Sequence, residues 1–177
     1  MTILDYINPI KIVVFLTFVF ALFRLKWDKP NNRYAIIILG ISLILEIVNS
    51  VFKMYHIKVN IPMTIGTVFH NSFWLALLAK NSSFKKPLYV AIGLFVFFSI
   101  VNFVAIEGPN SFNCYTFVIS AFLYLIFFII DSFYRLNKEE FSFFMSNDFL
   151  ILLSPILFFL GLSFMFGFKS SSLTSTM

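Results

Sequence analysis

Charged residues are scarce in this sequence: they make up 12% of its 177 residues, whereas 60% are hydrophobic. A soluble domain usually carries about 25% charged residues. Phenylalanine alone occupies 27 positions. A soluble fold of this length has too little interior to hide that much apolar surface, so we expect lipid to cover part of it. The composition therefore argues against a soluble protein, including a soluble nucleic-acid-binding protein, although the net charge is +5.

Cysteine is almost absent, since Cys114 stands alone in the sequence. One cysteine cannot form an internal disulfide, and one thiol does not make a metal site. The two histidines, His56 and His70, are expected in a loop and a helix, with no cysteine or acid cluster nearby to complete a metal site. We therefore expect no metal and no other cofactor, and we interpret Cys114 as a small apolar side chain near a helix end.

Catalytic motifs are also missing. The sequence has no G-x-S-x-G for a serine nucleophile, no H-E-x-x-H for zinc and no glycine-rich phosphate loop. The last apolar run has no lysine, so a retinal Schiff base is not supported. The acidic pair Glu139 and Glu140 lies in a polar stretch and is interpreted as solvated. We therefore expect a protein that is not an enzyme.

Long apolar runs separated by polar breaks predict an all-α fold, a polytopic bundle of six transmembrane helices. A hydrocarbon core of about 30 Å needs about 20 residues, and the first run reaches this length only if Lys11 and Arg24 snorkel. No cleavage site follows that run, so we expect it to be retained as a helix. Residues 1–168 are expected to form one domain, and the Ser/Thr-rich residues 169–177 a disordered tail. The expected spans are about 10–25, 34–52, 61–79, 87–106, 113–130 and 149–168.

Lysine and arginine are divided unevenly among the expected loops. The loops after the first, third and fifth spans, with their flanks, hold nine of them, and the other side holds four. The positive-inside rule places the richer side in the cytoplasm. We therefore expect a multi-pass protein of the cell inner (plasma) membrane with both termini outside. This orientation depends on six spans, because one miscounted span would put the termini on opposite sides.

Polar side chains interrupt the second apolar run at Glu46 and Asn49. They share one stripe of the helix with Ser42 and Lys53, within an arc of about 60°. A charged group at bilayer depth is costly and is by default a functional-site hypothesis. Because desolvation disfavours its charged form, Glu46 is expected to be protonated or paired with His70 or the asparagines. Lys53, near the helix end, is interpreted as a snorkelling anchor.

The third, fourth and fifth spans also carry polar residues, at depths from the midplane outward when the rise is about 1.5 Å per residue. We expect them to converge on one polar cavity. Glu46 would be its charge or proton partner, and the asparagines would orient a ligand. The alternative is that Asn, Ser and His hydrogen-bond between helices and only hold the bundle together. The expected ligand-binding residues are Glu46, Asn49, His70, Asn71, Asn102 and Ser120.

The order of these features resembles a broad set of uncharacterised bacterial inner-membrane proteins with six or seven helices. The likeness covers most of residues 34–168. Some members of such sets look like sensor input modules joined to cytoplasmic signalling domains, so the resemblance implies a sensing role. This chain departs from a seven-helix pattern and has no output domain, so signalling would have to pass through a partner. The features that carry the resemblance are Glu46 and Asn49; Thr67, His70 and Asn71; Asn113 and Thr116; and Pro155 and Gly161.

The preferred hypothesis is a non-catalytic integral membrane protein that binds or senses a small molecule through a polar intramembrane pocket. One alternative is a transporter or channel, or the membrane subunit of an uptake system. Vitamin-uptake subunits tend toward Gly/Ala-rich helices, whereas this chain has 27 Phe and 6 Gly, which counts against that alternative. Another alternative is a structural or assembly component. The expected partners are the lipid bilayer, a small-molecule ligand and a membrane-protein partner or second copy, but no nucleic acid.

Overall fold

The computed structural model describes residues 9–159, and all the regular elements in that range are helices. Four of these helices are long and apolar enough to cross a membrane: Pro30–Met54, Asn60–Asn81, Lys85–Ile106 and Cys114–Asn137. The prediction of a helical membrane protein is confirmed at this level. The elements are α1 (Pro9–Arg24), α2 (Pro30–Met54), α3 (Asn60–Asn81), α4 (Lys85–Val101), η2 (Asn102–Ile106), α5 (Cys114–Asn137) and α6 (Phe141–Phe144).

The first and last predicted spans are not among these four helices. The helix α1 has 16 residues. At about 1.5 Å per residue its length is about 24 Å, which is less than the hydrocarbon thickness. The last predicted span begins in a helix over Asn147–Phe159. Its remainder, residues 160–168, and the predicted disordered tail lie outside the described residues, so six spans and one domain over residues 1–168 stay predictions.

Two of the long helices extend beyond the apolar runs that predicted them. The helix α2 begins at Pro30, although Pro30-Asn31-Asn32 predicts a break between the first two apolar runs. Proline suits the first turn of a helix because the N–H that it lacks would have no partner there. The helix α5 continues to Asn137 because Asp131 and Arg135, one turn apart, form an ion pair of 2.8 Å. Helix length therefore follows capping and pairing as well as hydrophobicity.

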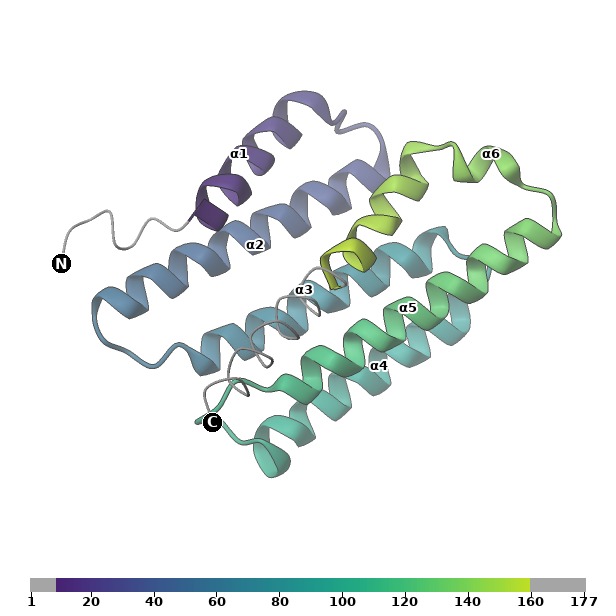
Figure 1. The fold of residues 1–177 in the computed structure, drawn as a ribbon. Coiled ribbons are helices and arrows are strands. Elements are labelled where there is room, and N and C mark those ends of the chain that lie inside the picture. The colour runs from purple at the N-terminus through teal and green to yellow at the C-terminus, as the bar shows by residue number, and fades with distance from the viewer. Residues whose placement is uncertain (1–8, 160–177) are drawn as a thin grey trace, which may run out of the picture. The chain divides into compact units, whose positions relative to one another are not determined.

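The chain divides into two compact units, Met1–Ser120 and Ala121–Met177. In the first unit, α1 to α4 pack as consecutive neighbours, each antiparallel to the one before it (Figure 1). Large apolar side chains such as Leu77 and Phe95 are buried between these helices. Others, such as Ile44 and Phe97, are exposed to more than half of their area. An apolar exterior of this kind suits a lipid environment.

The close approach of α2 and α3 depends on Gly66. A Cβ at this position would overlap the Leu45 side chain, with Cδ2 as its nearest atom. Small residues of this kind let helix backbones approach within a membrane. The contact also sets the register of the two helices, because it places Leu45 of α2 level with Gly66 of α3.

Amide side chains tie the loops at each end of the first unit. At one end, Asn31 at the start of α2 and Asn81 at the end of α3 exchange hydrogen bonds of 2.7 and 3.2 Å. At the other end, the Asn60 amide donates to the backbone carbonyl of Asn110 at 2.5 Å, which joins the α2–α3 loop to the α4–α5 loop. Both ends are thus held by neutral hydrogen bonds.

In the second unit, the end of α5 packs against the helix Asn147–Phe159. Pro155 has no N–H, so it frees the carbonyl of Ile151 one turn earlier. The Ser154 hydroxyl donates to that carbonyl at 2.8 Å, and the buried Tyr124 hydroxyl donates to the carbonyl of Leu152 at 2.7 Å. Two hydroxyls therefore donate to carbonyls on the proline-containing turn of an apolar helix.

Candidate functional site

Buried polar side chains gather where α3, η2 and the first turns of α5 meet. This cluster, which we call the polar seam, lies entirely within the first unit. Three of its members belong to α3, and the others belong to η2, the α4–α5 loop or the first turns of α5. The polar seam consists of Thr64, His70, Asn71, Asn102, Glu107, Asn113, Thr116 and Ser120.

At one level of the polar seam, Asn71 joins α3 to α5. Its amide donates to the Ser120 hydroxyl at 2.5 Å, and that hydroxyl donates to the Phe117 carbonyl at 2.7 Å. Nδ1 of His70 lies 3.3 Å from Oδ1 of Asn71, so the imidazole donates to the amide when that nitrogen is protonated. The His70 ring also lies edge-on to Trp74, with the ring centroids 6.3 Å apart. Three of the predicted site residues are thus in one hydrogen-bonded chain.

One turn nearer the start of α5, Asn102 makes the second level. Asn102 is fully buried, and its amide donates to the Thr116 hydroxyl at 3.0 Å and to a Glu107 carboxylate oxygen at 2.6 Å. The residue opens η2, a π-helical turn in which the Glu107 N–H donates to the Asn102 carbonyl at 3.0 Å. Single π-helical turns within α-helices frequently occur at functional sites.

Glu107 links this level to the beginning of α5. Its carboxylate accepts hydrogen bonds from the backbone N–H groups of Cys114 at 3.0 Å and Tyr115 at 3.1 Å. These N–H groups belong to the first turn of a helix, where the backbone has no internal partners and the helix dipole favours negative charge. The carboxylate therefore caps α5 and holds Asn102 at the same time.

Asn113 completes the connection between η2 and α5. In the amide orientation that satisfies both of its atoms, the nitrogen donates to the carbonyls of Gly108 and Ser111 at 3.2 Å. The oxygen accepts from the Phe103 N–H at 3.3 Å, and the Thr64 hydroxyl lies 3.4 Å from the same amide. The α4–α5 loop is therefore folded around this one buried side chain.

Glu46 and Asn49 are placed differently from the other predicted site residues. Both are partly buried on α2, and within the described residues the Glu46 carboxylate makes no hydrogen bond and no ion pair. Pairing of Glu46 with His70 or an asparagine, one of the two states expected from the sequence, is not present. The side-chain oxygen of Asn49 is buried without a hydrogen-bond partner. Two acceptors on neighbouring turns of α2 therefore have no donor.

The structure thus joins His70, Asn71 and Ser120 by two hydrogen-bond contacts. One turn away along α5, it joins Asn102 to Thr116. It does not join Glu46 or Asn49 to them by hydrogen bonds. The side-chain oxygen of Asn102 is also buried without a partner. In the part of the chain that is described, no group of three or more histidine, cysteine or acidic residues could hold a metal ion.

Glu107 is the member of the polar seam that sequence reasoning missed. In the sequence it belongs to Glu107-Gly108-Pro109-Asn110, a stretch that predicts a turn, and Gly108 has a positive φ of 74°, which glycine adopts readily. The available signal was an acidic residue placed seven positions before the start of an apolar helix. That spacing does not by itself show that the loop folds back far enough for the carboxylate to reach the helix N-terminus.

Comparison of this chain with protein-family models, with curated proteins and with solved structures gave no match.

Proposed function

We propose that this protein is a non-catalytic membrane protein that binds a small molecule at the face of α2 that carries Glu46 and Asn49. The proposal rests on the Glu46 carboxylate, which has no hydrogen-bond or ion-pair partner among residues 9–159. At about 1.5 Å per residue, Glu46 is about 12 Å from the end of α2 at Met54 and about 24 Å from its start. An acid at such a depth in a spanning helix is costly and is by default a functional group.

The chemistry of this face limits the ligand. Glu46 supplies a carboxyl group and Asn49 a buried amide oxygen, one turn apart on the same stripe. Both are hydrogen-bond acceptors when the acid is ionised. The matching ligand carries hydrogen-bond donors or positive charge, such as a primary amine or a monovalent cation.

The polar seam has a supporting role in this proposal. Asn71, Ser120 and Thr116 use their hydrogen-bonding groups on one another or on the backbone, and so they position α3 and α5. His70 lies one turn beyond Gly66, the residue that is level with Leu45, and because α2 and α3 run antiparallel this step leads away from the level of Glu46.

A hydrophobic carbodiimide tests the proposal, because it reacts with protonated carboxyl groups that are accessible from lipid. We expect it to modify Glu46 in protein reconstituted in nanodiscs, as located by peptide mass spectrometry. A panel of primary amines and monovalent cations should include compounds that slow this modification and raise the thermal midpoint of the protein, but not that of Glu46→Gln. Glu107, whose carboxylate is held by three hydrogen bonds, is the internal control and should react more slowly. The proposal is contradicted if the carbodiimide does not modify Glu46 and every compound in the panel leaves the wild type and Glu46→Gln with equal thermal midpoints.

The transmembrane topology belongs to the same proposal: six spans in a bacterial inner membrane, with both termini outside. It is supported by the basic residues of the first unit. Those around the α1–α2 and α3–α4 loops number seven and lie at one end, whereas Lys11, Lys53 and Lys58 lie at the other. The positive-inside rule assigns the end with more basic residues to the cytoplasm.

A structural or assembly component is the second candidate, and the internal hydrogen bonds of the polar seam favour it. If the partner of Glu46 is a donor from another protein or a second copy, that partner should copurify with the wild type and be lost with Glu46→Gln. Transport is separated from binding by flux into proteoliposomes of any compound that protects Glu46. Flux that Glu46→Gln abolishes would assign the protein to transport.

A further inference from the structure

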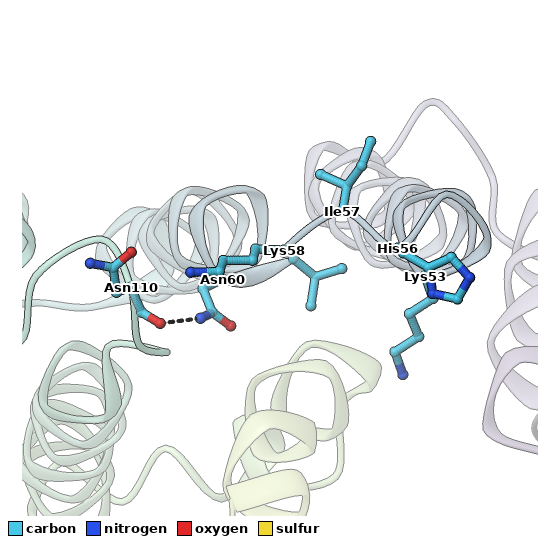
Figure 2. Close-up of a pocket in the computed structure, with 7 residues that line it drawn as sticks. Lys53, His56, Ile57, Lys58, Asn60 and Asn110 are labelled. Atoms are coloured by element: carbon cyan, nitrogen blue, oxygen red, sulfur yellow. Dashed lines mark hydrogen bonds between the residues drawn. The ribbon is translucent and has the colours of Figure 1, made fainter.

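An open hollow of about 440 Å³ lies where α2 ends and α3 begins (Figure 2). Lys53 and His56 lie side by side on one side of it, and Asn60 and Asn110 lie on the other. Its volume falls within the range of about 300–1,000 Å³ that is typical of small-ligand sites. The residues that line it are Lys53, His56, Ile57, Lys58, Val59, Asn60 and Asn110.

The side chains around this α2–α3 hollow carry positive charge without compensation. Lys53 and Lys58 contribute two ammonium groups, and no acidic residue is among the lining residues. In residues 9–159, the lysines of the hollow take part in no ion pair. Glu107, the acid at this end of the first unit, is already engaged with Asn102 and the start of α5. The hollow therefore favours an anion.

The backbone at the start of α3 adds hydrogen-bond donors that also favour an anion. Its first residue, Asn60, lines the hollow, and the preceding residue, Val59, makes no side-chain cap. The first N–H groups of a helix have no internal partners, and the helix dipole makes this end a favourable place for a phosphate or carboxylate group. The hydrogen bond from the Asn60 amide to the Asn110 carbonyl fixes this wall of the hollow (Figure 2).

The end of α2 holds His56 against the hollow by its backbone. The Ile57 N–H donates to the Phe52 carbonyl at 2.8 Å and the His56 N–H to the Lys53 carbonyl at 3.2 Å, which together form a Schellman motif. His56 occupies its left-handed position, with φ of 56°, where glycine is the usual residue. The backbone of this motif thus keeps the His56 imidazole in place beside Lys53.

Exposed apolar side chains surround the hollow. Met54, Ile57 and Ile61 each expose about half of their area, and they belong to the last turn of α2, the loop and the first turn of α3. In a spanning helix of 25 residues, the terminal turns extend beyond a hydrocarbon core that about 20 residues cross. Lysines at this level are placed beside lipid phosphates.

From these observations we propose that the α2–α3 hollow is a phosphate-binding site, occupied by the headgroup phosphate of an anionic lipid or by a free phosphate compound. Lys53 and Lys58 neutralise the phosphate charge, and the N–H groups of Asn60 and Ile61 at the start of α3 orient its oxygens, since Pro62 has no N–H and the Met63 N–H donates to the Val59 carbonyl. This site is independent of Glu46, so the two proposals can fail separately.

The test compares the full-length wild type with Lys53→Gln/Lys58→Gln in mild detergent. The first probe is short-chain phosphatidylglycerol, with phosphatidylcholine as the uncharged counterpart, and bound lipid is counted by native mass spectrometry. The second probe is inorganic phosphate, titrated by calorimetry. Lys85→Gln/Lys86→Gln is the matched control, because it removes the same charge from two exposed lysines at the other end of the first unit. Lys53→Arg/Lys58→Arg keeps the charge and should retain binding, which shows that losses do not arise from misfolding.

Two lysines at a membrane surface predict a loss of roughly thirtyfold in affinity for the anionic probe in Lys53→Gln/Lys58→Gln, with little change in the control. Loss of phosphatidylglycerol binding alone assigns the site to a lipid headgroup. Loss of inorganic phosphate binding as well assigns it to phosphate compounds in general. Equal affinity in the wild type and Lys53→Gln/Lys58→Gln, or an equal loss in the control, would overturn the proposal.

Discussion

At the scale of single residues, Glu107 concentrates more structural roles than any residue singled out from the sequence. One of its carboxylate oxygens accepts from Asn102 and from the Tyr115 N–H, and the other accepts from the Cys114 N–H. It therefore connects the π-helical turn η2 to the start of α5. Hydrogen bonds to a charged acceptor are shorter and stronger than neutral ones, so this contact should dominate the stability of the α4–α5 connection.

We expect Glu107→Gln to lower the free energy of unfolding by about 1–2 kcal/mol, because the amide keeps one acceptor but loses the charge at the helix N-terminus. The measurement is reversible unfolding in mixed detergent, followed by circular dichroism. Glu139→Gln is the control, since Glu139 is an exposed acid in the α5–α6 connection. If both variants lose the same stability, Glu107 is not a cap that depends on its charge.

Residue-scale reasoning from the sequence identified polar residues on the helices but did not assign their partners. Asn71 was predicted near the middle of its helix and Ser120 in the outer half of another, and the structure joins the two by a hydrogen bond. Glu46 was predicted to be protonated or paired with His70 or an asparagine, and in the described residues that pairing is not present. Depth follows from counting residues along a helix, whereas a partner depends on the rotation of each helix about its axis. That rotation is set by packing, which a single sequence does not display.

At the scale of elements, hydrophobic runs predicted where helices lie but not where they end. The runs 34–52, 61–79 and 87–106 all lie within observed helices. The ends of α2 and α5 follow from Pro30 and from the pair of Asp131 and Arg135, which are local polar effects. The π-helical turn η2 has no signature in the spacing of its apolar residues, because Asn102 is stabilised by partners distant in sequence.

Gly66 allows a test of the α2–α3 contact. Gly66→Ala should destabilise the protein by about 1–3 kcal/mol, because the new methyl group meets the Leu45 side chain in a packed interface. The measurement is again unfolding in mixed detergent.

Gly93 provides the matched control for this prediction. It lies within α4, and a Cβ there would meet nothing within 4 Å. Gly93→Ala should therefore be neutral or stabilising by up to about 1 kcal/mol, since alanine favours the helix. Shortening Leu45 in the double variant Leu45→Ala/Gly66→Ala should remove part of the clash. Equal effects of Gly66→Ala and Gly93→Ala would contradict a close contact at Gly66.

At the scale of the whole molecule, the chain consists of two compact units that share one continuous helix, α5. The first unit contains the polar seam, the Glu46 face of α2 and the α2–α3 hollow. The long helices and their apolar exteriors follow from composition, which is why membrane association was predictable from the sequence. The division at Ser120 was not predictable, because no break in hydrophobicity or loop residue marks it.

The proposed sidedness makes a prediction for Cys114, whose side chain is exposed at the start of α5. We expect a membrane-impermeant maleimide to label this thiol in intact cells, because the proposal places this end of the first unit outside. In Cys114→Ser/Ser83→Cys, the thiol moves to the exposed α3–α4 connection at the other end. That variant should be labelled only after the membrane is permeabilised. The reverse pattern would invert the topology.

The π-helical turn η2 has a consequence for how the protein tolerates changes in length. A π-helical turn holds one residue more than the α-helical hydrogen-bond pattern requires. Deleting one residue there, such as the exposed Val104, would restore α-helical spacing while Glu107 keeps nearly the same direction, because the wide turn already accommodates the extra residue. The same deletion in a regular α-helical turn would rotate everything that follows by about 100°. A single deletion should therefore be tolerated better within η2 than within Lys85–Val101.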